Sequence, residues 1–121
     1  MIDCLRGKVI HRESDHVVLD VHDVGYRVFV PNPYALGTGG EPVILYVHTH
    51  VREDAILLFG FPTREEQAFF RMLIEVPGIG PKMAMGILGS GRPEAIAAAV
   101  RAGDANYLTR LPGVGKKTAQ R

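Results

Sequence analysis

A glycine-rich turn followed by lysine occurs twice in this chain and is its clearest chemical signal. The first copy is Pro77-Gly-Ile-Gly-Pro-Lys82, and the second, 35 residues later, is Pro112-Gly-Val-Gly-Lys-Lys117. Glycines two apart permit positive φ in a tight turn and leave no side chain to obstruct a ligand. A helix that begins directly after the turn presents free N–H groups and the positive end of its dipole, which attract phosphate. The repeat therefore predicts a duplicated phosphate-binding unit.

Each residue type in the two turns has an expected role. The apolar residue between the glycines, Ile79 or Val114, is expected to point inward as an anchor. The glycines would offer backbone amides, and the lysines would add point charges beside the helix start. Contacts of this kind go to the DNA backbone and carry no sequence information. The predicted DNA-binding residues are Gly78, Gly80, Lys82, Gly113, Gly115, Lys116 and Lys117.

Two other glycine motifs are excluded by spacing. A dinucleotide-binding fingerprint needs a third glycine three residues after the second, but Met83 and Thr118 occupy those positions. A phosphate-binding P-loop needs a glycine where Arg110 stands. The remaining structural interpretation is a pair of ordinary helix connections with solvated lysines. Two copies in register make that interpretation less favourable than a phosphate-binding role.

The first sixty residues show the pattern of β-strands. Short runs rich in β-branched and aromatic residues alternate with glycine and proline turn signals. Five short antiparallel strands suit a small closed or half-closed barrel, because closure removes exposed strand edges; an SH3-like barrel is the main competitor. The expected strands cover residues 5–10, 16–21, 26–30, 43–48 and 55–60.

The hydrophobic period changes to that of helices after Pro62. Thr63 and Glu66 form a capping-box pattern, which predicts a helix that runs to about Glu75. The last expected helix is cut off after one and a half turns, which suggests a fragment of a longer protein. The fold class is therefore α+β, with a β-barrel over 1–62 and a helical domain that carries both glycine turns over 63–121. Further helices are expected from Pro81, from Pro93 to Ala102, from Asp104 to Arg110 and after Gly115.

Charge is distributed unevenly between the two halves. The net charge of the 121 residues is +1. Residues 1–63 hold five Lys and Arg against eight Asp and Glu, whereas residues 64–121 hold nine against five. An anionic partner would therefore meet the C-terminal half first. The chain has no apolar run near the roughly 18 residues of a membrane span and no signal-peptide pattern at its start, so we expect a cytoplasmic protein without a membrane contact.

The motifs and their order resemble the RuvA family of bacterial Holliday-junction-binding proteins. The resemblance rests on Arg6-Gly-Lys-Val-Ile10, Val24-Gly-Tyr26, Val51-Arg-Glu-Asp-Ala55 with Leu58-Phe-Gly60, Gly78-Ile-Gly-Pro-Lys82 and Leu111-Pro-Gly-Val-Gly-Lys-Lys-Thr118. It implies an OB-fold barrel over residues 1–62, a tandem helix-hairpin-helix domain over residues 63–121 and a homotetramer, with a tetramer or an octamer on DNA left open. It also implies a protein that holds four-way junction DNA open in recombination, DNA repair and the SOS response to DNA damage. The partners would be the RuvB ATPase motor and the RuvC resolvase. The family's third, C-terminal domain, which grips the motor, is absent from these 121 residues.

An acidic pair, Glu53 and Asp54, is expected at the tip of a hairpin between two strands. Taken alone, such a pair is most often a solvated turn. Two adjacent carboxylates offer too few oxygen ligands for magnesium. The resemblance implies instead that both residues belong to an acidic pin at the centre of the tetramer, where they would repel phosphates at the crossover.

The remaining metal-binding residue types give weak signals. His48 and His50 lie two apart on an expected strand and share a face, but no third ligand is near in sequence for zinc. They are more simply a surface or interface pair. The single Cys4 forms no internal disulfide and is expected to be a small buried hydrophobe. We predict no metal, no cofactor and no catalytic residue.

Two other functions share parts of the pattern. The second hairpin also resembles that of base-excision DNA glycosylases, in which a lysine at the position of Lys117 attacks the sugar. That chemistry needs an aspartate roughly twenty residues downstream and an aromatic base-flipping pocket. The chain ends four residues after Lys117 and contains no Trp. The other alternative is an accessory duplex-binding domain of a nuclease or helicase, which would share the hairpins but not the acidic pair.

Overall fold

The computed structural model describes residues 1–90 of the chain. The chain divides into two compact units, Met1–Gln67 and Ala68–Arg121, and each is described by itself. The helices expected from Pro93, from Asp104 and after Gly115 lie outside the described residues. Within residues 1–90, no helix is long and apolar enough to cross a membrane.

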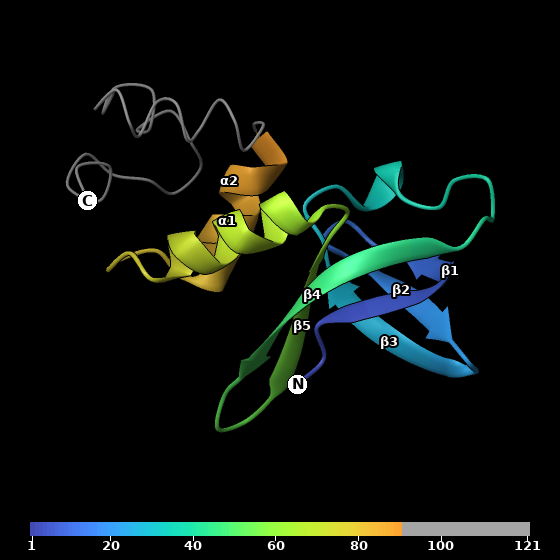
Figure 1. The fold of residues 1–121 in the computed structure, drawn as a ribbon, viewed down its shortest axis with the longest axis horizontal. Coiled ribbons are helices and arrows are strands. Elements are labelled where there is room, and N and C mark those ends of the chain that lie inside the picture. The colour runs from blue at the N-terminus through green and yellow to red at the C-terminus, as the bar shows by residue number, and fades with distance from the viewer. Residues whose placement is uncertain (91–121) are drawn as a thin grey trace. The chain divides into compact units, whose positions relative to one another are not determined.

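The first unit is a closed five-stranded barrel with the OB-fold strand order (Figure 1). Going round the barrel, the order is β1-β2-β3-β5-β4, and β4 pairs with β1 to complete the circuit. All neighbouring strands are antiparallel except β3 and β5, which are parallel. This order confirms the OB-fold barrel and excludes the SH3-like alternative. The strands are β1 Cys4–Arg12, β2 His16–Val21, β3 Val24–Phe29, β4 Val43–Val51 and β5 Ile56–Phe61.

The barrel interior is filled by alternate residues of each strand, as the period of two in a strand requires. Leu19, Val28 and Leu45 are completely buried and come from three different strands. Gly60 lets β5 approach this core closely, because a Cβ there would lie 2.5 Å from a methyl carbon of Val28. The apolar core residues are Leu5, Val17, Leu19, Val28, Val30, Leu45, Val47 and Leu58.

The β2–β3 turn differs from the turn expected from the sequence. The expected strands 16–21 and 26–30 leave residues 22–25 for this connection, but Gly25 lies within β3, directly opposite Asp20. The turn consists of His22 and Asp23, which have φ angles of 49° and 69°. A two-residue hairpin with positive φ at both positions matches the right-handed twist of the strands. The Asp20 carboxylate stabilises it by accepting a 2.9 Å hydrogen bond from the Asp23 N–H.

The β3–β4 connection contains a short 3₁₀ helix, η1, over Pro33–Ala35. The glycine-rich segment that follows lies between the expected strands 26–30 and 43–48 and forms turns. Gly37 and Gly40 adopt φ angles of 59° and 77°, which residues with side chains rarely do. This loop brings the chain back to the start of β4.

Helix α1, Arg64–Ile74, begins where the capping pattern predicted and ends one residue earlier than expected. Thr63 Oγ1 accepts a 3.2 Å hydrogen bond from the Glu66 N–H, which satisfies one of the free donors at the helix start. The buried Gln67 anchors this part of α1 to the barrel. Its side-chain amide donates to the Val47 carbonyl at 2.8 Å and to the Asp3 carbonyl at 3.1 Å.

The second unit holds the rest of α1 and helix α2, Pro81–Ser90. Pro81 is the first helical residue, as expected for a residue whose missing N–H would have no partner there. The second unit buries one apolar face of each helix. The buried apolar side chains are Phe69, Phe70 and Leu73 on α1 and Ala84, Ile87 and Leu88 on α2.

Candidate nucleic-acid interface

The first glycine turn joins α1 to α2 and is open to solvent. Pro77, Gly78 and Gly80 are exposed, and Ile79 between the glycines is half-buried. The Ile79 N–H donates to the Val76 carbonyl at 3.1 Å, which closes the turn. Within residues 1–90, the N–H groups of Gly78 and Gly80 donate no backbone hydrogen bond.

The two glycines are required for different reasons. Gly78 has a φ angle of 92°, so its conformation itself favours glycine. Gly80 does not have positive φ, which corrects the expectation that both residues would use this freedom. A Cβ on Gly80 would meet nothing within 4 Å. Neither backbone strain nor internal packing in the described chain explains glycine at position 80.

The N-terminus of α2 follows directly from Gly80. The Gly80 carbonyl accepts a 3.0 Å hydrogen bond from the Ala84 N–H, so Gly80 is the residue that precedes the first helical turn. The N–H groups of the first turn have no acceptor inside the helix, and the helix dipole makes this end positive. Lys82 is exposed in the same turn. The structure thus brings Gly78, Gly80 and Lys82 together around one exposed helix start.

The second predicted turn lies outside the described residues. Its four predicted contact residues are Gly113, Gly115, Lys116 and Lys117.

The acidic pair lies at the tip of the β4–β5 hairpin. The Arg52 N–H donates to the Ala55 carbonyl at 2.8 Å and closes the turn. Glu53 and Asp54 occupy its two central positions and are exposed. Within residues 1–90, neither carboxylate forms an ion pair. The tip therefore carries two negative charges with no compensating cation in contact.

The histidine pair of β4 belongs to a set of ring contacts. The ring centroids of His48 and His50 are 6.3 Å apart, and the His50 ring also lies 6.1 Å from that of Phe59. In the described part of the chain, no group of three His, Cys, Asp or Glu side chains is placed to hold a metal ion.

Cys4 is exposed, so the expectation of a buried thiol is wrong. The cause is strand alternation. Leu5 points into the barrel, so its neighbour Cys4 at the start of β1 faces outward.

A polar cluster at the start of α1 was missed by the sequence analysis. The Arg64 guanidinium donates to the Asp3 carboxylate at 2.7 Å and lies 4.7 Å from the ring centroid of Tyr46. The hydrogen bond to Asp3 is the largest cause of a raised pKa of Arg64. The signal in the sequence was Gln67, which lies on the apolar stripe of α1 with Phe70 and Ile74.

Comparison with protein families finds two matches along the chain. Residues 1–60 match the RuvA N-terminal domain. Residues 70–121 match the SAM-like helix-hairpin-helix tandem, and this segment contains both glycine turns.

Curated relatives match the chain from end to end. A Holliday junction branch migration complex subunit RuvA from Trichlorobacter lovleyi is 53% identical over 123 residues, which cover 100% of this chain and 61% of the relative. Proteins of the same name from Brevibacillus brevis and Geobacter sulfurreducens are 48% and 50% identical, with 100% of this chain and 60% and 62% of the relatives covered. The chain thus spans about three fifths of the length of these relatives.

Proposed function

Because the chain belongs to the RuvA family, we propose that it binds four-way DNA junctions as a non-catalytic subunit of a branch migration complex. The relatives carry that complex in their names. The proposed role is to hold the junction open while an ATP-driven motor moves DNA through it.

The observation that carries the proposal is the exposed turn before α2. Gly80 has ordinary φ and open space where its Cβ would lie, so nothing inside the described chain calls for glycine there. A nucleic-acid strand that contacts the backbone at position 80 would require glycine there, because it would leave no room for a side chain. Such a strand would meet the N-terminus of α2 and the Lys82 ammonium, which are both suited to phosphate.

We propose that the second turn repeats this contact on the same duplex arm. Gly113 and Gly115 would offer amides, and Lys116 and Lys117 would neutralise phosphates across the minor groove. A few charge contacts from one subunit bind weakly at physiological salt. Four subunits on one junction would act together, so useful affinity would come from assembly.

The acidic tip would act on the crossover and would not bind DNA. Glu53 and Asp54 are exposed and without an ion pair in the described chain, so their charges are available to repel phosphate. In a fourfold assembly about eight such carboxylates would meet near the axis. Repulsion between exposed charges is about 1 kcal/mol per close pair in water. Together the carboxylates would keep strands parted at the exchange point.

The proposed function also requires assembly of several copies of the chain and contact with partner proteins. We propose a homotetramer that acts in the cytoplasm in recombination and DNA repair, either as one tetramer on the junction or as two. In the full-length protein the partners would be the RuvB motor and the RuvC resolvase. We assign the barrel, residues 1–62, to the tetramer core, where its apolar surface would carry much of the contact, and residues 63–121 to DNA binding.

A gel-shift comparison of a four-way junction with a linear duplex, together with a mass measurement of the free protein, tests the proposal. We expect strong preference for the junction, little dependence on base sequence, and a tetramer. A monomer that binds both DNAs equally would instead favour an accessory duplex-binding domain. Release of a base or cleavage of the strand would favour the glycosylase alternative at Lys117.

A further inference from the structure

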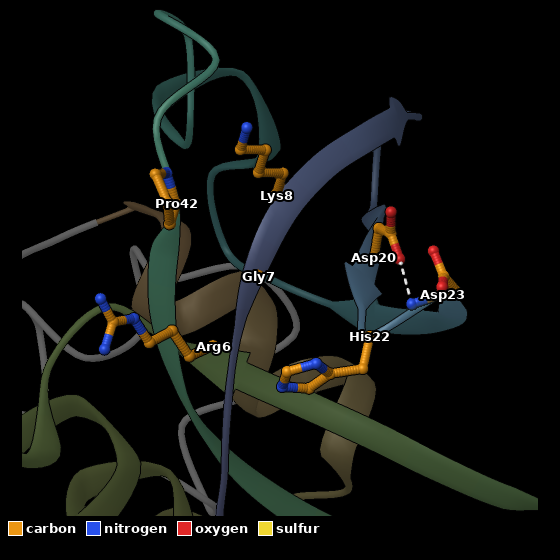
Figure 2. Close-up of a pocket in the computed structure, with 7 residues that line it drawn as sticks. All are labelled: Arg6, Gly7, Lys8, Asp20, His22, Asp23 and Pro42. Carbon is orange, nitrogen blue, oxygen red and sulfur yellow. Dashed lines mark hydrogen bonds between the residues drawn. The ribbon is translucent and has the colours of Figure 1, made fainter.

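A surface pocket of about 450 Å³ lies on the barrel, and none of its lining residues has a role in the proposed function. Its walls come from the first half of β1, the end of β2, the β2–β3 turn and the residue before β4. The volume falls within the range of about 300–1,000 Å³ that is common for small-ligand sites. The lining residues are Arg6, Gly7, Lys8, Asp20, His22, Asp23 and Pro42 (Figure 2).

One wall of the pocket carries two unpaired cations. Arg6 and Lys8 are two residues apart on β1, so their side chains leave the same face of the strand, and both are exposed. Neither forms an ion pair within residues 1–90.

Asp20 would be expected to neutralise Lys8, because the two residues are direct cross-strand partners. The Asp20 carboxylate is instead held by the Asp23 N–H at 2.9 Å, where it stabilises the β2–β3 turn. Figure 2 shows the Lys8 and Asp20 side chains on opposite sides of the β1 ribbon. The Lys8 ammonium therefore remains available to an anion from outside the protein.

The pocket is held in shape by Gly7, which lies between the two cations. A Cβ on Gly7 would lie 2.1 Å from the Asp20 carbonyl oxygen, so only glycine lets β1 and β2 approach this closely. The backbone positions of β1 and β2 therefore set the distance between the wall that carries Arg6 and Lys8 and the β2–β3 turn.

Figure 2 shows the Arg6 and Lys8 head groups directed apart, but both side chains are exposed and can turn toward one ligand. We propose that this pocket binds a phosphate group, toward which the Arg6 guanidinium and the Lys8 ammonium both turn. An arginine can donate two parallel hydrogen bonds to such a group, and a lysine adds a point charge. The His22 and Pro42 rings line the remaining space, so the phosphate belongs to a larger ligand of nucleotide size. Asp20 and Asp23 on the other wall repel further anionic groups, which favours a single phosphate over a polyphosphate. The inference stands on the barrel alone and does not depend on junction binding.

The test is an NMR titration of the ¹⁵N-labelled 121-residue chain with inorganic phosphate, a nucleoside 5′-monophosphate and the same nucleoside without phosphate. We expect saturable shifts of the Gly7 and Lys8 amide signals with the monophosphate, weaker ones with inorganic phosphate and none with the nucleoside. Arg6→Gln and Lys8→Gln should each weaken binding about five-fold. The control is Arg27→Gln, which removes an exposed cation of β3 outside the pocket and should leave the affinity unchanged.

A short single-stranded oligonucleotide distinguishes the two sources of the phosphate. Displacement of the monophosphate by the strand would support a nucleic-acid ligand, and failure to displace it would support a free nucleotide. The proposal is overturned if no phosphate probe shifts these amides, or if the affinity is the same in Arg6→Gln, Lys8→Gln and Arg27→Gln. Both pocket residues are exposed, so circular dichroism should show unchanged folding. Gel shifts with a junction remain a separate test of the proposed function.

Discussion

The side-chain amide of Gln67 donates a 2.8 Å hydrogen bond to the backbone carbonyl oxygen of Val47. Gln67 is only 2% exposed, and the same amide also donates to the Asp3 carbonyl at 3.1 Å. One buried polar side chain thus joins the start of α1 to β4 and to the N-terminal segment. A buried donor that satisfies two carbonyl groups is costly to replace.

Gln67→Glu should lower the free energy of unfolding by about 1–3 kcal/mol at neutral pH, because it removes the donor and places a carboxylate against carbonyl oxygens. Burial beside these oxygens and the Asp3 carboxylate would raise the folded-state pKa of the new carboxyl above its unfolded value. The Arg64 guanidinium, which donates to the Gln67 side-chain oxygen at 2.9 Å, would offset part of this rise. The folded state then takes up the proton first, so the deficit relative to the natural chain should shrink as the pH falls from 7 to 5. Urea unfolding of both proteins at the two pH values measures this difference.

The matched control for that experiment is Glu65→Gln on the same helix, where the side chain is exposed and only the favourable interaction of a first-turn carboxylate with the helix dipole, about 0.5 kcal/mol, should be lost. A Gln67→Glu deficit that is the same at pH 7 and pH 5 would contradict the buried contact.

Gly80→Thr should weaken junction binding about ten-fold and change the free energy of unfolding by less than about 0.5 kcal/mol. Threonine and glycine are similar at the residue before a helix, and the space around a Cβ at this position is open within the protein. The added side chain would block only an external strand. Gel shifts measure the affinity for the junction, and thermal unfolding measures the change in the free energy of unfolding. Gly89→Ala, an exposed change at the other end of α2, is the control. Equal junction affinity of the Gly80→Thr and Gly89→Ala variants would show that DNA does not contact the Gly80 turn.

Lys82→Gln should flatten the dependence of log affinity on log salt by about 0.9 for each phosphate contact that is lost. Lys117→Ala should flatten it by a similar amount, because the two residues occupy corresponding positions of the repeat. Binding isotherms from low to moderate salt measure the slopes. The control is Arg27→Gln on β3, which should not alter the slope. If the Lys82→Gln variant has the same slope as the Arg27→Gln variant, Lys82 does not contact phosphate.

Glu53→Gln combined with Asp54→Asn should tighten junction binding and reduce discrimination against other branched DNA. The reason is the loss of repulsion between exposed carboxylates and phosphates, and folding should not change because neither carboxylate forms an ion pair in the described chain. Competition between a four-way junction and a three-way junction measures the discrimination. Glu41→Gln, an exposed change in the β3–β4 loop, provides the charge control. Unchanged discrimination would refute the acidic pin.

The local alternation of apolar and polar residues was enough to predict a strand wherever that alternation is strong. The predicted strand 16–21 coincides with β2, whose Val17 and Leu19 are completely buried. The end of β4 was placed at His48 but lies at Val51. The extra residues are polar or exposed, and they are held by pairing with β5, in which Val51 lies opposite Ile56. Such pairing is a property of the whole barrel and has no local signature.

The same distinction applies to the candidate sites. The glycine turn before α2 was predicted because its geometry is local, and the structure brings Gly78, Gly80 and Lys82 together. The pocket beside Lys8 was not predicted, because it depends on which strands are neighbours. Nothing in the sequence says that Asp20 lies opposite Lys8 and yet bonds to the Asp23 amide.

The parallel contact of β3 with β5, in which Val28 lies opposite Leu58, closes the circuit of strands. Every strand of the barrel therefore has two neighbours, although the β3–β5 contact comprises only two residue pairs, Val28–Leu58 and Phe29–Phe59. Closure leaves less backbone edge for another chain to extend than an open sheet of the same strands would leave. Side chains on the outer face of the barrel can mediate association of copies while this circuit of strands stays intact. Substitutions on its outer face can therefore alter association without unravelling the sheet itself.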